Sequence, residues 1–115
     1  MINLRHCRII LLMIFIETSL FTKLLSSYLQ DDEYHMLQCY LIEHPEVGDI
    51  VRGSGGVRKA RWAVKNKGKS GGIRVIYYWK KSAHEIWMLT LYSKSEQATI
   101  PSHILKQIAE EINNE

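Results

Sequence analysis

Basic side chains are concentrated in one stretch of this chain, and their types suit chemistry on a phosphodiester. Residues 52–81 contain ten lysines and arginines and no aspartate or glutamate, whereas the other 85 residues contain five basic and twelve acidic side chains. A charge asymmetry of this size indicates a polyanionic partner. The cations that fall on two expected strands and on the turn between them are Arg58, Lys59, Arg61, Lys65, Lys67, Lys69 and Arg74.

The alternation of a β-strand sorts these cations between two faces of a sheet. It places Lys59, Arg61 and Lys65 on one face, and it places Arg58 on the other. Cations presented by a rigid sheet bind RNA phosphates. A soluble surface usually mixes charges of both signs, so ten cations without an anion favour a binding face. Nearby aromatic side chains could stack on bases, although core packing explains them more simply. They are Trp62, Tyr77, Tyr78 and Trp79.

The patterns of other enzyme classes are missing from the sequence. It has no Walker A loop, no GxSxG turn and no HExxH pair. The glycine-rich stretch Gly53–Gly56 leads into an expected strand, and so it lacks the helix N-terminus that binds phosphate. The five histidines are scattered, and the two cysteines make neither a disulfide framework nor a metal-ligand spacing. The sequence therefore predicts no cofactor and, by default, a cytoplasmic protein.

The hydrophobic pattern places the cations within a small α+β domain. A chain of 115 residues is one domain, and its apolar positions predict the order β-α-α-β-β-β-α. The first two helices form an N-terminal helical hairpin, and Pro45 ends the second one. This grouping indicates a small antiparallel sheet, half covered by helices, with a C-terminal helix. The predicted strands are 14–16, 57–64, 73–79 and 86–92, and the predicted helices are 18–28, 31–44 and 101–112.

The first residues are set apart from this domain. The apolar run Ile9–Ile16 follows basic residues and so imitates a signal peptide, but it is much shorter than the ~20 residues that span a bilayer. Glu17 follows the run without a cleavage site of small residues, which disfavours a cleaved or anchoring signal while leaving it open. We therefore expect residues 1–12 to be an upstream extension, untranslated or disordered, and residues 13–115 to form the domain.

An ordered set of motifs gives this sequence a family resemblance. The motifs begin near Phe15 and continue to the last expected strand, and their order is more specific than any single one of them. The main motifs are Val51-Arg52-Gly53, Gly55 to Trp62, Gly68 to Tyr78 and Leu89 to Glu96. Over residues 13–112 the chain resembles the HigB branch of the RelE toxin superfamily.

This resemblance implies a toxin of a type II toxin–antitoxin pair that inhibits translation by cleaving messenger RNA in the ribosomal A site. Cleavage in such proteins needs no metal and proceeds by attack of a ribose 2′-hydroxyl on the adjacent phosphate. The implied partners are a helix-turn-helix antitoxin, the ribosome and mRNA, with no membrane. Two alternatives stay open, a related toxin fold that inhibits DNA gyrase and an RNA-binding module without catalysis. Codon preference, antitoxin identity and oligomeric state are not predicted.

The resemblance also implies roles for individual residues. Lys59 and Arg61 match the strand positions of the family's catalytic lysines, one of which is a proposed general base. Arg74 matches the arginine that stabilises the reacting phosphate. Tyr92 and Lys94 lie where some relatives orient the nucleotide and supply a proton, and the general acid and base are not identified individually. Contact with RNA, rather than catalysis, is expected of Arg58, Lys65, Lys67 and Lys69.

Overall fold

The computed structural model describes residues 13–64, 72–93, 96 and 100–114, and within them the chain forms one sheet with α-helices on both sides. The α+β class predicted from the sequence is confirmed. The upstream segment 1–12 lies outside the described residues, so its separate status stays a prediction. None of the described helices is long and apolar enough to cross a membrane.

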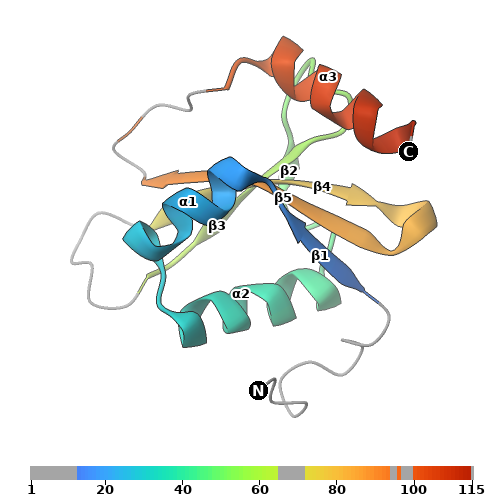
Figure 1. Cartoon of the computed structure of the whole chain (residues 1–115). Helices are drawn as coiled ribbons and strands as arrows, with labels where there is room; N and C mark the ends of the chain where they lie inside the picture. The colour runs from blue at the N-terminus through green and yellow to red at the C-terminus, as the bar shows by residue number, and fades with distance from the viewer. Residues whose placement is uncertain (1–12, 65–71, 94–95, 97–99, 115) are drawn as a thin grey trace.

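A five-stranded sheet forms the centre of the described domain. Its strands are β1 (Ile14–Glu17), β2 (Asp49–Ile50), β3 (Arg58–Trp62), β4 (Ile73–Lys80) and β5 (Glu85–Ser93). Their order across the sheet is β1-β5-β4-β3-β2 (Figure 1). The pairs β3–β4 and β4–β5 are antiparallel as predicted, and β2 also pairs antiparallel with β3, whereas β1 runs parallel to β5 at one edge. No tight turn joins β1 to β5, so their relative direction is not constrained to be antiparallel. The two-residue β2 was not predicted because so short a strand has no periodicity.

Each predicted helix is present. The helices are α1 (Ser19–Tyr28), α2 (Asp31–Glu43) and α3 (Ser102–Asn113). α1 begins after Thr18, whose Oγ1 accepts a hydrogen bond of 3.0 Å from the Phe21 backbone N–H. α2 begins with acidic residues, which the helix dipole favours at that end, and it ends shortly before Pro45. The helix boundaries therefore follow from local sequence signals.

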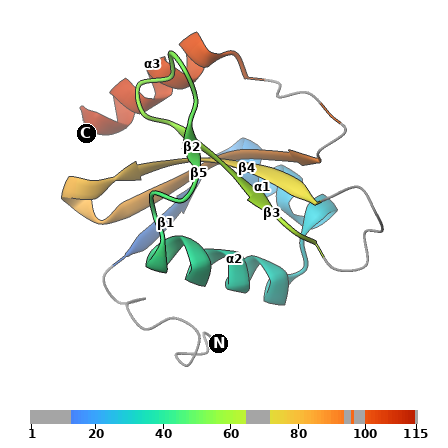
Figure 2. The same ribbon diagram turned by 180° about the vertical axis from the view of Figure 1, so that it is seen from behind.

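The sheet carries a hydrophobic core on each face, and Figures 1 and 2 show α2 and α3 on opposite sides of it. Alternation along β4 divides its buried side chains between the two cores. Val75 and Tyr77 pack with residues of α1 and α2, whereas Ile76 packs in the smaller cluster with α3. Full burial of one such large side chain contributes ~1.5–3 kcal/mol. Arg74 alternates with Val75, so it projects on the same side as Ile76.

Hydrogen bonds from Tyr77 fix the loop that leads into β2. Its hydroxyl donates to the Pro45 carbonyl at 2.7 Å and accepts from the Gly48 backbone N–H at 3.0 Å. A Cβ on Gly48 would approach the Lys59 carbonyl and the Tyr77 ring to 3.0 Å, so glycine is the residue that fits without displacing them. β2 is thereby held against β3, where Asp49 pairs with Lys59.

Candidate nucleic-acid interface

Three of the predicted site residues form a row across the middle strands of the sheet. Arg61 of β3 pairs with Arg74 of β4, and Arg74 pairs with Tyr92 of β5. Side chains of directly paired residues point to the same face of a sheet. Lys59 precedes Arg61 by two residues on β3, and by alternation it shares this face. The face that carries these four side chains is called the basic face below.

A bulge in β5 brings Tyr92 to the basic face. The pairing between β4 and β5 shifts between Ile76 and Tyr77, which leaves Leu89 as an extra residue in β5. Without this residue, strict alternation would put Tyr92 on the same side as Met88, which is buried in the core with α1 and α2. Bulges often occur beside functional sites because they redirect a side chain. The sequence predicted the strand but not the bulge.

Arg74 lies in the middle of the row with a hydrogen-bond donor that is not used. Its side chain is half-buried, and its Nη1 is shielded from solvent without a hydrogen-bond partner in the described part of the chain. A buried donor without a partner costs ~1–3 kcal/mol, and a charged one costs more. Arg61 carries the same charge directly opposite, which adds repulsion. A phosphate on the basic face would offset the repulsion between the two cations, because its charge is opposite and its oxygens accept from guanidinium nitrogens.

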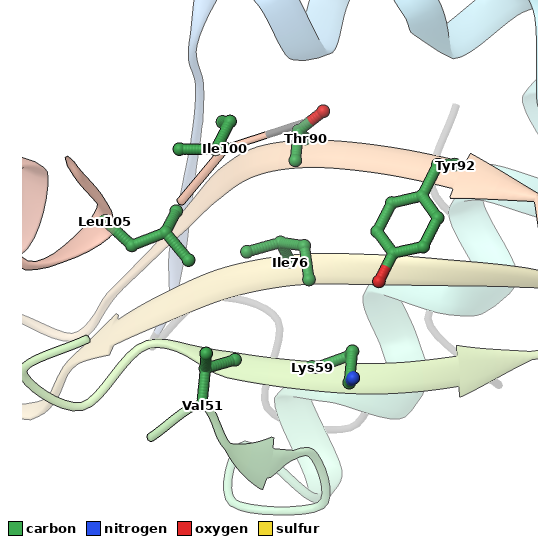
Figure 3. A pocket seen from close by; sticks show the side chains of 7 residues that line it. All are labelled: Val51, Lys59, Ile76, Thr90, Tyr92, Ile100 and Leu105. Carbon is green, nitrogen blue, oxygen red and sulfur yellow. The ribbon is translucent and has the colours of Figure 1, made fainter. Parts of the chain in front are cut away.

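Tyr92 supplies an aromatic ring and a hydroxyl that stays protonated at neutral pH. Burial raises the pKa of Tyr92 above its ordinary value, and the neighbouring Arg74 cation partly opposes this rise. Figure 3 shows the ring extending from β5 over β4, with the hydroxyl on the side toward Lys59. The side chain can therefore stack on a base or donate a hydrogen bond to a substrate oxygen.

A hollow of about 60 Å³ opens beside Lys59 and Tyr92 (Figure 3). It is lined by Val51, Lys59, Ile76, Thr90, Tyr92, Ile100 and Leu105. Pockets that enclose a whole small-molecule ligand measure ~300–1,000 Å³. This hollow admits at most the edge of a larger group.

α3 covers the other end of the same face. Lys80 Nζ donates to the Ile112 carbonyl at 2.8 Å, and Asn113 Nδ2 donates to the Tyr78 hydroxyl at 2.7 Å. Both contacts involve the last part of β4, whereas Arg74 is its second residue. The last turn of α3 is thus fixed at the end of β4 far from Arg74, whereas Leu105, near the start of the helix, lines the hollow together with Lys59 and Tyr92.

The other predicted site residues are not brought to the basic face by the described structure. Arg58 projects on the opposite side of β3, and its Nη1 donates to the Glu46 carbonyl at 2.9 Å and the Gly48 carbonyl at 2.8 Å. These bonds give Arg58 a structural role before β2, and its contact with RNA stays a prediction. Lys65, Lys67, Lys69 and Lys94 lie outside the described residues.

Two polar residues of this face were missed from the sequence. Asp49 pairs with Lys59 and so places a carboxylate beside the cations. Thr90 is buried at the hollow and pairs with Ile76. Asp49 belongs to a strand too short to predict, and the bulge determines the direction of Thr90. Neither position carries a signal in the hydrophobic pattern.

Comparison with known proteins connects this geometry to a family. A family model described as the RelE toxin of the RelE/RelB toxin–antitoxin system matches residues 18–114. Among solved structures, the chain is similar to the E. coli toxin RelE in the free state, in a variant with two arginines replaced by alanine. The TM-score is 0.58 at 16% sequence identity, over 84% of this chain and 97% of that one. At this identity the structural likeness shows a shared fold.

Proposed function

This chain belongs to the RelE toxin family, and from that premise we propose that it arrests translation by cutting messenger RNA in the ribosomal A site. The observation that carries the proposal is the row Arg61–Arg74–Tyr92 with Lys59 beside it, in which Arg74 holds a buried donor without a described partner. The motif resemblance given above further supports membership of the HigB branch. The toxin would act in the cytoplasm, where ribosomes translate.

In the proposed reaction, the phosphorus of a phosphodiester is transferred from the 5′-oxygen of one nucleotide to the 2′-oxygen of the preceding one. The ribose 2′-oxygen bonds to phosphorus as the bond to the 5′-oxygen breaks, which leaves a 2′,3′-cyclic phosphate and a 5′-hydroxyl. Arg74 and Arg61 stabilise the charge that develops on the phosphate oxygens. Lys59 and Arg61 both lie on β3, but arginine keeps its proton in proteins. Lys59 is therefore the residue that takes the proton from the 2′-hydroxyl. Tyr92 orients the nucleotide, and Lys94 is assigned proton supply from the family pattern.

Alignment of the substrate is proposed to come from the ribosome. The hollow beside Tyr92, with a volume of about 60 Å³, is too small to enclose a nucleotide. Correct positioning of reactants can supply ~7–11 kcal/mol of barrier reduction. The A site would hold the message in place while the basic face supplies charge and proton transfer.

Cleavage by the purified toxin tests this proposal. The parent protein should cut ribosome-bound mRNA far faster than the same RNA free in solution. Arg74→Ala should lose this activity, whereas Lys81→Ala, which removes an exposed cation from the β4–β5 turn, should keep it. Equal rates on bound and free RNA would contradict the role of the ribosome.

Two other functions predict different experimental results, one in cells that express the toxin and one in a binding assay. A gyrase inhibitor of related fold would damage DNA and leave transcripts whole. A non-catalytic RNA-binding module would retain intact RNA in a binding assay. The cognate helix-turn-helix antitoxin should neutralise the toxin, and its gene beside this one would support the assignment.

A further inference from the structure

Hydrogen bonds at the two ends of α1 connect it to β5 and to Glu96, which follows β5 in the chain. At the start of the helix, the Thr18 backbone N–H donates to the Met88 carbonyl at 3.0 Å, and Thr18 Oγ1 donates to the Leu89 carbonyl at 2.8 Å. At the other end, the Tyr28 hydroxyl donates to Glu96 Oε1 at 2.7 Å. The first contact meets β5 at its bulge, and the second meets the chain just after β5 ends.

The Glu96 carboxylate is hydrogen-bonded to Ser93, the last residue of β5. Its Oε1 accepts from the Ser93 backbone N–H at 3.1 Å and from Ser93 Oγ at 3.0 Å, in addition to Tyr28. The Glu96 backbone N–H donates to the Ser93 carbonyl at 3.0 Å. The hydrogen bond from Tyr28, followed by those from Ser93, lowers the pKa of Glu96, so the group is an ionised acceptor at neutral pH.

These contacts lie on both sides of Tyr92 along the chain. The bulge at Leu89 decides which face of the sheet Tyr92 occupies, and Ser93 is its immediate neighbour. The apolar side of α1 packs in the core on the opposite face, where Phe21 is fully buried. α1 therefore reaches the strand that carries Tyr92 from the side that RNA does not approach.

We propose that Tyr28 and Glu96 are positioning residues, which hold the end of β5 so that Tyr92 stays aligned with Arg74. This inference rests on the proposed function, because its effect is measured as RNA cleavage. The two residues themselves touch no substrate. Displacement of reacting groups by about 1 Å can cost ~10²-fold in rate, so a smaller release of the β5 end has a measurable effect.

Tyr28→Phe tests the inference, because it removes one exposed hydroxyl and keeps the ring in the core cluster. Its kcat on ribosome-bound mRNA should fall about tenfold, within the range that misplacement produces, with the KM for ribosomes little changed. Glu96→Ala should show the same loss, and Glu96→Gln, which keeps an acceptor oxygen, should recover part of the activity. Thermal unfolding of each variant reports its stability.

A double-variant comparison separates positioning from general weakening. In a Tyr92→Ala background, Tyr28→Phe should cause no further loss, because the residue that it positions is absent. Tyr34→Phe is the matched control, since its hydroxyl also donates to a glutamate, Glu17 at 2.8 Å, but joins α2 to β1. It should keep the parent kcat.

The outcomes distinguish this inference from the proposed function. A parent protein that cuts no ribosome-bound mRNA would contradict the proposed function itself. If the parent protein cuts ribosome-bound mRNA and both Tyr28→Phe and Glu96→Ala keep the parent kcat, the inference alone is overturned. Additive losses from Tyr28→Phe and Tyr92→Ala would also overturn it, because the two residues would then act independently.

Discussion

Arg74 of β4 and Tyr92 of β5 lie directly opposite each other in the sheet, so a cation and an aromatic ring meet on one face. The Arg74 charge opposes the rise in the Tyr92 pKa that burial causes. This pairing exists because Leu89 is an extra residue in β5. A cation for a phosphate and a ring for a base are therefore adjacent through an irregularity of the strand.

Arg74→Met should remove RNA cleavage without weakening the fold. Methionine keeps an unbranched apolar stem at the half-buried position and removes the Nη1 donor that has no described partner. We expect cleavage of ribosome-bound mRNA to fall ~10²–10³-fold, as for loss of one transition-state donor. The free energy of unfolding should stay the same or rise by up to ~1 kcal/mol. Urea unfolding and a cleavage assay measure the two effects, and a large loss of stability would mean that Arg74 serves the fold.

Arg58→Met should have the opposite effect. The Glu46 and Gly48 carbonyls would lose their donor, and the free energy of unfolding should fall by ~1–3 kcal/mol. Cleavage by the folded fraction should be unchanged, since Arg58 projects away from the basic face. If this variant stays stable but binds RNA weakly, the sequence-based expectation of an RNA contact is right.

Much of the fold was predictable because its elements have strong local signals. The β-branched and aromatic residues of β4, the N-cap at Thr18 and the stop before Pro45 all led to elements that the structure contains. The shared face of Lys59 and Arg61 followed from alternation on a single strand. Such features depend on residues that are close in sequence.

The rest of the site depends on pairings between distant residues. No local pattern shows that Leu89 is an extra residue, although the face of Tyr92 depends on it. The contact between Tyr28 and Glu96 joins residues 68 positions apart. Asp49 reaches the cations only through a two-residue strand. Register is a property of the assembled sheet, and a single sequence does not specify it locally.

Tyr34 predicts how stability changes at alkaline pH. Burial, followed by its hydrogen bond to Glu17, raises the Tyr34 pKa well above the ordinary 10.0. As the pH rises, the unfolded chain therefore loses the Tyr34 proton at a lower pH than the folded chain does. The contribution of Tyr34 to stability is complete below pH 10 and declines above it. Tyr34→Phe should flatten the fall in the free energy of unfolding between neutral pH and about pH 10.5. Urea unfolding at both values measures this, and parallel curves for the two proteins would contradict it.

Charge should control how fast the antitoxin binds. RelE toxins work with an antitoxin, and the stretch 52–81 carries ten cations without an acid. Opposite charge accelerates encounter more than it strengthens the final complex. The association rate should therefore fall roughly tenfold or more from low to high salt, with little change in the dissociation rate.

Arg61→Gln should reduce the association rate at low salt, whereas Lys23→Gln on the exposed surface of α1 should not. Stopped-flow binding at several salt concentrations measures these rates. A rate that does not depend on salt would mean that the antitoxin docks on the apolar helical side, and that the basic face serves RNA alone.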